Sequence, residues 1–392
     1  MSEATTSGAP AHPEAFVPLP RTTFVSSEGR HLHVYGEVRG RPGPDWPKVE
    51  PAALHRRFDA LGGAWIAISP ARNVRPHAAD EPGPTGLVCP LCPGGPEVPF
   101  SYQAAVFDNR FPALVALPPA PPDGAGFGPA LGRAEVVLYT EVHDETFADL
   151  EPVELARVVA VWRDRSDDLW ADPAHAFVMA FENHGEAVGA TLSHPHGQAF
   201  AMDHLPPFIE ARVRALSEGR RASGACVTCA VAERDASERP VFAGEHFVVA
   251  VPFAPRWPYE VHVRARRHGL RRLGDLRAAE QQALATALRG VARRYDRLFG
   301  FELPYMMTIM EAPAGADDWH LAVEFLPPHR SERLTKVRAS VETASGLFLN
   351  DTLPEASAER LARIEAPVEH EADPFIVVRA VETGAGGGER RP

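Results

Sequence analysis

Short apolar runs alternate with one long amphipathic stretch in the first half of the chain. Residues 65–69, 135–139 and 176–182 are apolar runs bounded by turn-forming residues, and they predict strands. Between the second and third runs, apolar residues recur at helical spacing from Pro152 to Leu169, which predicts a helix. The face expected to be buried carries Leu155, Val158, Val159 and Trp162.

The second half of the chain repeats this order. We predict a long helix over residues 276–298, preceded and followed by strands at 246–251, 260–263, 305–310 and 321–326. Several strands combined with few helices are typical of an α+β fold. We therefore expect two similar halves, each an antiparallel sheet with helices.

Length and local composition predict the domain boundaries. The 392 residues exceed the usual size of one domain, so we expect one domain over 21–218 and a second over 219–370. Residues 1–20 are rich in proline and small residues, and 371–392 are rich in glycine. Both segments are predicted to be disordered, because neither can bury enough apolar surface to offset its ordering entropy.

The overall charge restricts the classes of partner. The formal net charge of −12 disfavours binding to a nucleic-acid backbone. No apolar run reaches membrane-spanning length, and the N-terminus lacks the basic and apolar segments of a secretory signal. We expect a cytoplasmic protein whose partners include neither nucleic acid nor a membrane.

The four cysteines form two pairs of identical spacing, Cys89 with Cys92 and Cys226 with Cys229. In a cytoplasmic chain this spacing favours metal binding or redox chemistry over structural disulfides. A redox motif requires a helix start in a thioredoxin-like unit. The first pair lies instead among prolines and glycines, which favours a metal there.

Each cysteine pair is followed by two histidines in matching order, which indicates an internal duplication. The first set is Cys89, Cys92, His143 and His194, and the second is Cys226, Cys229, His268 and His320. Two thiolates and two neutral imidazoles form a closed tetrahedral shell that suits structural zinc. We expect one zinc in the first set and a second in the other, where a surface position for His268 and a core role for His320 are the alternatives.

The most informative segment is Ser193-His194-Pro195-His196-Gly197-Gln198. Its proline restricts the backbone between the two imidazoles, and residues two apart in an extended segment face the same way. A bare His-X-His could equally be a pair of surface-loop histidines. The predicted strand just upstream and the amide of Gln198 favour a site for phosphate chemistry.

Several segments carry a resemblance to a known family. They are Arg56-Arg57-Phe58, Ser69-Pro70-Ala71-Arg72, Phe181-Glu182-Asn183, residues 193–198, Trp257-Pro258-Tyr259-Glu260 and residues 346–351. With the first cysteine pair, they make the chain resemble the galactose-1-phosphate uridylyltransferase family of the histidine triad superfamily. The resemblance implies two histidine-triad-like halves, a homodimer, and transfer of UMP from UDP-glucose to galactose 1-phosphate in galactose metabolism.

The resemblance also implies roles for individual residues. His196 would be the nucleophile that forms a uridylyl-histidine intermediate in a ping-pong reaction, with its other ring nitrogen held by a carbonyl near His194. Gln198 would donate its amide to the phosphoryl oxygens. The implied substrate-binding residues are Arg72, Arg75, Asn109, Asn183, Gly189, Thr191, Gln198, Lys336 and Glu342. Lys336 and Glu342 would reach the hexose phosphate from the neighbouring subunit.

The chain departs from this family where relatives carry an iron site. Ala322 and Glu324 stand at two of the expected histidine positions, Glu311 at the third, and Arg212 at the expected glutamate. We therefore expect no iron. Superposing the two copies places Ala322 on His196, so only the N-terminal copy is expected to be catalytic.

Two other functions remain open from the sequence. Other nucleotidyltransferases, phosphorylases and hydrolases of the histidine triad superfamily share the nucleophile but differ in nucleotide choice, commonly at the position of Gln198. Outside the enzymes, the alternative is a zinc-stabilised binding protein with a vestigial catalytic loop. The intact loop from His194 to Gln198 argues against that alternative.

Overall fold

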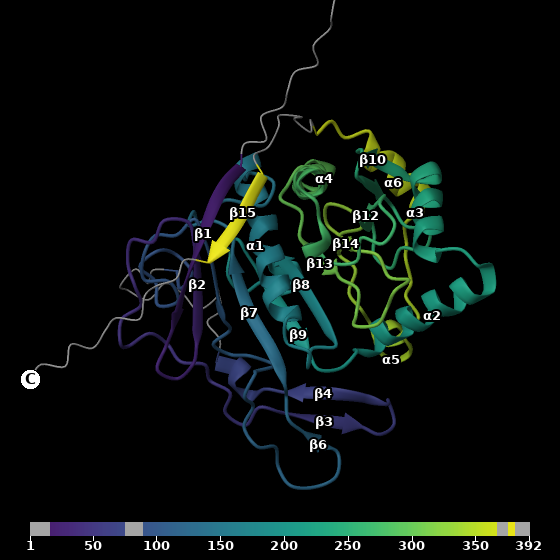
Figure 1. Ribbon diagram of the computed structural model, residues 1–392. Coiled ribbons are helices and arrows are strands. Elements are labelled where there is room, and N and C mark those ends of the chain that lie inside the picture. Colours follow the sequence, from purple (N-terminus) through teal and green to yellow (C-terminus); the bar gives the residue numbers. More distant parts are fainter. Residues whose placement is uncertain (1–15, 75–88, 367–374, 381–392) are drawn as a thin grey trace, which may run out of the picture.

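A twelve-stranded sheet forms the centre of the computed structural model, which describes residues 16–74, 89–366 and 375–380 (Figure 1). Its strand order is β10-β11-β12-β14-β13-β8-β9-β7-β5-β2-β1-β15. The N-terminal half supplies β1 (Phe16–Val25), β2 (His31–Tyr35), β5 (Ala104–Asp108), β7 (Gly132–Leu138), β8 (Phe177–His184) and β9 (His196–Met202). The C-terminal half supplies β10 (Pro240–Ala243), β11 (Phe247–Ala250), β12 (Val261–Ala265), β13 (Tyr305–Met310), β14 (Ala322–Leu326) and β15 (Phe375–Ala380).

The sheets of the two halves join edge to edge. β8 pairs with β13 in antiparallel register, with Asn183 opposite Met306 and Phe181 opposite Thr308. The expected α+β fold of two halves with antiparallel sheets is confirmed, and the two sheets are continuous through this pair. Residues from both halves therefore lie next to one another at the centre of the molecule.

Two long helices cover one face of the sheet. α1 (Pro152–Trp170) and α4 (Ala278–Leu298) pack against each other and share one hydrophobic core with strands of both halves (Figure 1). α1 begins at the predicted proline, and a capping box between Glu151 and Glu154 satisfies backbone groups at its start. Its predicted apolar face is buried. No helix within the described residues is long and apolar enough to cross a membrane.

Smaller elements surround this frame. A separate sheet consists of β6 (Phe127–Gly128), β3 (His55–Asp59) and β4 (Ala64–Ile68), which lie at the bottom of Figure 1. The remaining helices are α2 (Pro207–Ser223), α3 (Val227–Glu238), α5 (Ser340–Ser345) and α6 (Pro354–Ala362). Three short 3₁₀ turns are η1 (Pro70–Val74), η2 (Glu186–Val188) and η3 (Leu273–Asp275).

Strands extend into both segments that the sequence predicts to be disordered. β1 begins at Phe16, and β15 pairs with it in parallel, with Leu19 opposite Val378. Backbone pairing between the two ends of the chain satisfies polar groups that each segment alone would leave to water. The rest of the predicted terminal segments lies outside the described residues.

The expected boundary after residue 218 falls inside a helix. α2 runs on to Ser223 and ends at Gly224, which has a φ of 68°. Glycine adopts this left-handed conformation at little cost, so the helix ends there. The position of the domain boundary thus stays a prediction, and the structure shows only that residue 218 lies within α2.

A buried ion pair occupies the place for which the resemblance implied an iron site in other family members. Arg212 on α2 lies 2.7 Å from one oxygen of Glu324 on β14, and Arg256 lies 2.9 Å from the other. Burial alone would raise the pKa of Glu324, but the two arginines and His262 outweigh it and hold the pKa far below its ordinary value. Ala322 offers no ligand atom, and both oxygens of Glu324 are already paired. Glu324 also lies with Glu260 and His262 in a group whose possible ligand atoms are within 4.8 Å of one another, but the two arginines occupy both of its oxygens.

Glu311 does not belong to this position, which corrects the sequence assignment. Its carboxylate accepts hydrogen bonds from Ser166 and Trp170 of α1 at 2.8 and 3.0 Å. The residue opposite Ala322 across the β13–β14 pair is Met310. Successive residues of a strand face opposite sides of the sheet. The sequence assignment was wrong by one position, so it chose Glu311, which faces α1, in place of Met310, which lies opposite Ala322.

We predict that Arg212→Ala destabilises the protein, because it removes a charge-assisted hydrogen bond to a buried carboxylate and a contact 5.1 Å above the Trp319 ring. The expected loss in the free energy of unfolding is about 1.5–3 kcal/mol, measured by urea denaturation. The control is Arg214→Ala, at an exposed position of the same helix, with an expected change within about 0.5 kcal/mol. Equal losses for both variants would show that the ion pair contributes no specific stabilisation.

Candidate active site and metal centres

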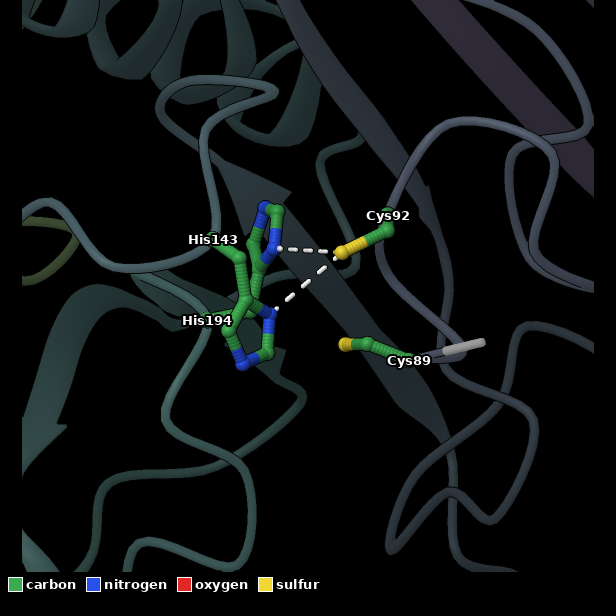
Figure 2. Close-up of side chains that lie close together, drawn as sticks. All are labelled: Cys89, Cys92, His143 and His194. Carbon is green, nitrogen blue, oxygen red and sulfur yellow. Dashed lines mark hydrogen bonds between the residues drawn. The ribbon is translucent and has the colours of Figure 1, made fainter. Parts of the chain in front are cut away.

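The first predicted ligand set comes together in one cluster. The ligand atoms of Cys89, Cys92, His143 and His194 all lie within 4.8 Å of one another (Figure 2). The Nδ1 atoms of His143 and His194 lie 3.3 and 3.5 Å from the sulfur of Cys92. Ligand atoms about 3.5 Å apart are what a tetrahedral zinc with sulfur and nitrogen ligands requires. The cysteines are free thiols, so the donor set fits a metal ion.

Contacts around the cluster orient one of its imidazoles. The Nε2 atom of His194 lies 3.0 Å from the carbonyl oxygen of Thr140 and 3.0 Å from the hydroxyl of Tyr102. That hydroxyl donates its own proton to the Leu91 carbonyl, so it accepts from the imidazole. The ring proton of His194 is thereby placed on Nε2, which leaves the Nδ1 lone pair directed at the cysteines.

Thiol chemistry at the cluster is consistent with a cation. Burial, followed by the neighbouring Cys89, raises the pKa of Cys92 to about 11. A thiol with this pKa stays protonated at neutral pH, whereas metal ligation requires the thiolate. Binding of a divalent cation would supply the charge that stabilises the ionised sulfur.

His196 is oriented by the backbone of His194. Its Nδ1 donates a hydrogen bond of 2.7 Å to the His194 carbonyl, which leaves the Nε2 lone pair available. Burial lowers the pKa of His196, so the ring is neutral at neutral pH. The next position requires glycine, because a Cβ at Gly197 would collide with the Tyr139 hydroxyl and come within 2.9 Å of the Phe181 carbonyl oxygen. The result is a fixed, neutral imidazole with one free nitrogen.

His196 lines a cavity of about 700 Å³ at the end of β8. Three predicted substrate-binding residues, Asn183, Gly189 and Thr191, line the same cavity. Gly189 has a φ of 83° and ends the turn η2, so the loop can fold back over the cavity. The structure therefore places these three residues and His196 around one cavity.

Other predicted residues lie beside this cavity rather than in its wall. Gln198 follows His196 on the same face of β9, opposite Val136 of β7. Arg72 on η1 donates a hydrogen bond of 3.3 Å to the Phe111 carbonyl. Asn109 accepts a hydrogen bond of 2.9 Å from the Phe111 backbone and lines a second cavity of about 300 Å³. Arg75 lies outside the described residues.

Lys336 and Glu342 are separate from the cavity and pair with each other. Their charged atoms lie 2.6 Å apart, and both side chains are buried. Lys336 also donates to the carbonyls of Arg256 and Leu349. The ammonium of Lys336 is the main cause of a lowered pKa at Glu342. Within one chain these residues form an internal support for the loop they share.

The second ligand set also assembles, with different surroundings. Ligand atoms of Cys226, Cys229, His268 and His320 lie within 4.8 Å of one another. Cys229 lies 3.4 Å from Nδ1 of His268 and 3.8 Å from Nδ1 of His320. The Nε2 atom of His320 receives the backbone N–H of Gly269 at 3.4 Å, whereas the equivalent atom of His194 faces a carbonyl. His268 is exposed, so this set is less enclosed than the first.

Among the cavity-wall residues that sequence reasoning missed, three lie in contact with one another. Glu182 and His184 flank Asn183 on β8, and Glu302 precedes β13. His184 lies 2.9 Å from Glu302 and 3.6 Å from Glu182. Proximity to Asn183 could have identified the first two. Glu302 gives no local signal, because only the pairing of β8 with β13 brings it to the cavity.

Comparisons with known proteins agree with this geometry. Residues 47–206 match the family described as galactose-1-phosphate uridyl transferase, N-terminal domain, and residues 193–373 match its C-terminal domain. A galactose-1-phosphate uridylyltransferase of Thermotoga maritima is 36% identical over 324 residues, covering 80% of this chain and 100% of the relative. A galactose-1-phosphate uridylyltransferase of Streptomyces lividans is 35% identical over 372 residues, covering 88% of this chain and 98% of the relative.

Solved structures show the same similarity. A structure described as a uridylyltransferase matches with a TM-score of 0.72 and 29% identity, covering 79% of this chain and 97% of the other. An ADP-glucose phosphorylase of Arabidopsis thaliana shares the fold, with a TM-score of 0.62 and 22% identity over 80% of this chain and 99% of the other. With both of its halves matched in order and its relatives aligned over nearly their full length, the chain belongs to the galactose-1-phosphate uridylyltransferase family.

Proposed function

We propose that the chain is a galactose-1-phosphate uridylyltransferase that uses His196 as its nucleophile. The observation that carries the proposal is the 2.7 Å hydrogen bond from Nδ1 of His196 to the His194 carbonyl, within the cavity lined by Asn183 and Gly189. It leaves a neutral nitrogen free to attack phosphorus. An imidazole suits this reaction because it is nucleophilic at neutral pH and leaves readily in the next step.

The first half-reaction forms a bond between Nε2 of His196 and the α-phosphorus of UDP-glucose. The bond from that phosphorus to the bridging oxygen breaks, and glucose 1-phosphate leaves with the electron pair. The positive charge that develops on the imidazole is stabilised by the His194 carbonyl, which accepts a hydrogen bond from the Nδ1–H group. Gln198, on the same face of β9, is positioned to donate its amide to the phosphoryl oxygens.

The second half-reaction reverses these changes with a different sugar phosphate. A phosphate oxygen of galactose 1-phosphate attacks the phosphorus of the uridylyl group, and the bond to Nε2 breaks. UDP-galactose leaves, and His196 returns to its neutral state. Both sugar phosphates occupy the same place in turn, which gives the ping-pong order.

A different superfamily activity is the second candidate. The phosphorylase from Arabidopsis thaliana has this fold, but its identity of 22% limits the likeness to the fold. Relatives at 35–36% identity over most of the chain are uridylyltransferases, and they favour UDP-glucose and galactose 1-phosphate as substrates. The free cysteine pairs suit the reducing cytoplasm, which we propose as the compartment.

The covalent intermediate gives a direct test. UDP-glucose labelled in the α-phosphate is expected to leave acid-labile label on the protein, whereas label in the β-phosphate is expected to leave in glucose 1-phosphate. His196→Gly is expected to form no adduct and to lose activity by at least about 10⁴-fold, because no other nitrogen replaces Nε2. His246→Asn, on the edge of β11 and away from the cavity, is the control and is expected to react normally. An unchanged adduct in His196→Gly would refute the mechanism.

We also propose structural zinc in both ligand sets. Four donors close the tetrahedral shell in each case, so zinc would supply folding stability and would not take part in the transfer. In the first set the shell includes His194, whose backbone orients the nucleophile. Zinc there would hold Cys89, Cys92 and His143 on that same segment.

Metal analysis by mass spectrometry is expected to find two zinc ions and no iron per chain. Cys229→Ser is expected to reduce the count to one while the uridylyl adduct still forms. A chelator is expected to remove the second zinc first, because His268 is exposed and His320 lacks the carbonyl contact that orients His194. One zinc in the unmodified protein would exclude the second site, and stoichiometric iron would contradict the reading of Arg212 and Glu324.

We propose that the active enzyme is a homodimer formed in part by the segment 334–353. Five apolar side chains of this segment are more than half exposed: Leu334, Val337, Leu347, Leu349 and Leu353. An apolar surface of this kind is typical of a protein interface. A second copy placed on it would bring the loop that the Lys336–Glu342 pair supports next to the other chain.

The oligomeric state tests this surface. Light scattering is expected to give the mass of two chains, and the double variant Leu347→Asp, Leu353→Asp is expected to give the mass of one chain, because charged groups cannot be buried unpaired at an interface. Leu117→Asp, an exposed leucine on another part of the surface, is the control and is expected to remain dimeric. A monomeric unmodified protein would refute the homodimer, and a dimeric double variant would refute this interface.

A further inference from the structure

Glu302 places a carboxylate in the wall of the nucleophile's cavity. It lies between α4 and β13 in the C-terminal half, and its side chain is 58% exposed. The cavity of about 700 Å³ includes both Glu302 and His196 in its wall. The carboxylate is therefore accessible from the space in which the substrates react.

His184 holds this carboxylate in one orientation. Its Nε2 lies 2.9 Å from Glu302, its Nδ1 lies 3.6 Å from the fully buried Glu182, and its ring stacks on Tyr305 at 4.8 Å. Burial alone would lower the pKa of His184, but the hydrogen bond to Glu302 and the charge of Glu182 outweigh it and raise the pKa. The same hydrogen bond lowers the pKa of Glu302, so the carboxylate is ionised at neutral pH.

The two sides of His196 offer different surroundings for the two parts of the substrate. Along β9, Gln198 and Phe200 lead away from the cavity toward Ala134, whose carbonyl accepts the backbone N–H of Asn109. In the other direction the cavity continues along the loop from Gly185 to Ser193 and reaches Glu302. In-line displacement places the leaving group opposite the nucleophile. We assign the nucleotide to the Gln198 side and the sugar phosphate to the cavity.

We propose that Glu302, oriented by His184, accepts hydrogen bonds from the ring hydroxyls of the hexose 1-phosphate and helps to select the sugar. This inference rests on the proposed uridylyl transfer. A carboxylate is an acceptor with about four lone-pair sites, of which His184 occupies one. Sugar hydroxyls are neutral donors that fill the others without charge repulsion. The phosphate of the same molecule would be repelled by Glu302, so it lies at the His196 end of the cavity.

The test compares steady-state kinetics of Glu302→Ala with those of the unmodified enzyme. The KM values for galactose 1-phosphate and UDP-glucose are expected to rise at least about tenfold, because a hydrogen bond to a charged group is lost. Inhibition by UMP, which has no hexose, is expected to be unchanged. Glu245→Ala removes a surface carboxylate outside the cavity and is expected to change none of these values.

A series of monodeoxygalactose 1-phosphates identifies the hydroxyl. In the unmodified enzyme the analogue lacking that hydroxyl is expected to show the raised KM of Glu302→Ala, and in the variant the analogue and galactose 1-phosphate are expected to have equal KM values. His184→Gln, which cannot carry the charge that orients Glu302, is expected to raise the same KM by a smaller factor. Comparing His184→Gln with Glu302→Ala separates the effect of losing the orientation of Glu302 from the effect of losing its carboxylate.

The outcomes separate this inference from the proposed function. If Glu302→Ala forms the uridylyl adduct with full yield and its KM values for both sugar substrates are unchanged, Glu302 does not bind the sugar and the uridylyl mechanism stands. If UMP inhibition weakens as much as sugar binding, Glu302 supports the whole cavity and the inference is also refuted. If the unmodified enzyme forms no adduct, the proposed function itself fails.

Discussion

His194 connects two parts of the site through one residue. Its imidazole faces Cys92 in the first Cys2His2 set, and its carbonyl oxygen accepts a hydrogen bond of 2.7 Å from Nδ1 of His196. Only Pro195 separates the two histidines, and its ring restricts the backbone between them. A movement of the Cys2His2 set would therefore turn the imidazole of His196. Under the proposed function, the set would fix the orientation of the nucleophile, and its four donors would leave no coordination position for a substrate.

The sequence predicted those parts of the fold whose signals are local. The helix from Pro152 and the strands with periodic apolar residues are present, and both Cys2His2 sets assemble from residues far apart in the chain. The pairing of β1 with β15 was not predictable, because it joins segments more than 350 residues apart and neither carries a local signal for the other. Glu311 was misplaced by one strand position, which is enough to exchange the faces of a sheet. Glu302 carries no motif and reaches the cavity through tertiary pairing alone.

The two halves carry different side chains at matching positions of the same sheet arrangement. In the first copy β9 carries His196 and Gln198, whereas in the second copy β14 carries Ala322 and Glu324 at the matching positions. In the second half Glu324 forms an ion pair with Arg212, which connects α2 to the sheet. A buried charge is tolerated there because its partners surround it. The matching strand positions therefore carry an ion pair in one half and an imidazole beside a cavity in the other.

The antiparallel pair of β8 with β13 makes the cavity wall depend on both halves of the chain. Asn183 lies opposite Met306, and Glu302 enters the cavity wall just before the same strand, so the cavity lies beside the junction of the two halves. Separating the halves would leave β8 and β13 each with an unpaired edge and would remove Glu302 from the cavity wall. The C-terminal half therefore contributes a residue to the cavity wall, although Ala322 stands where the comparison of the two halves places His196.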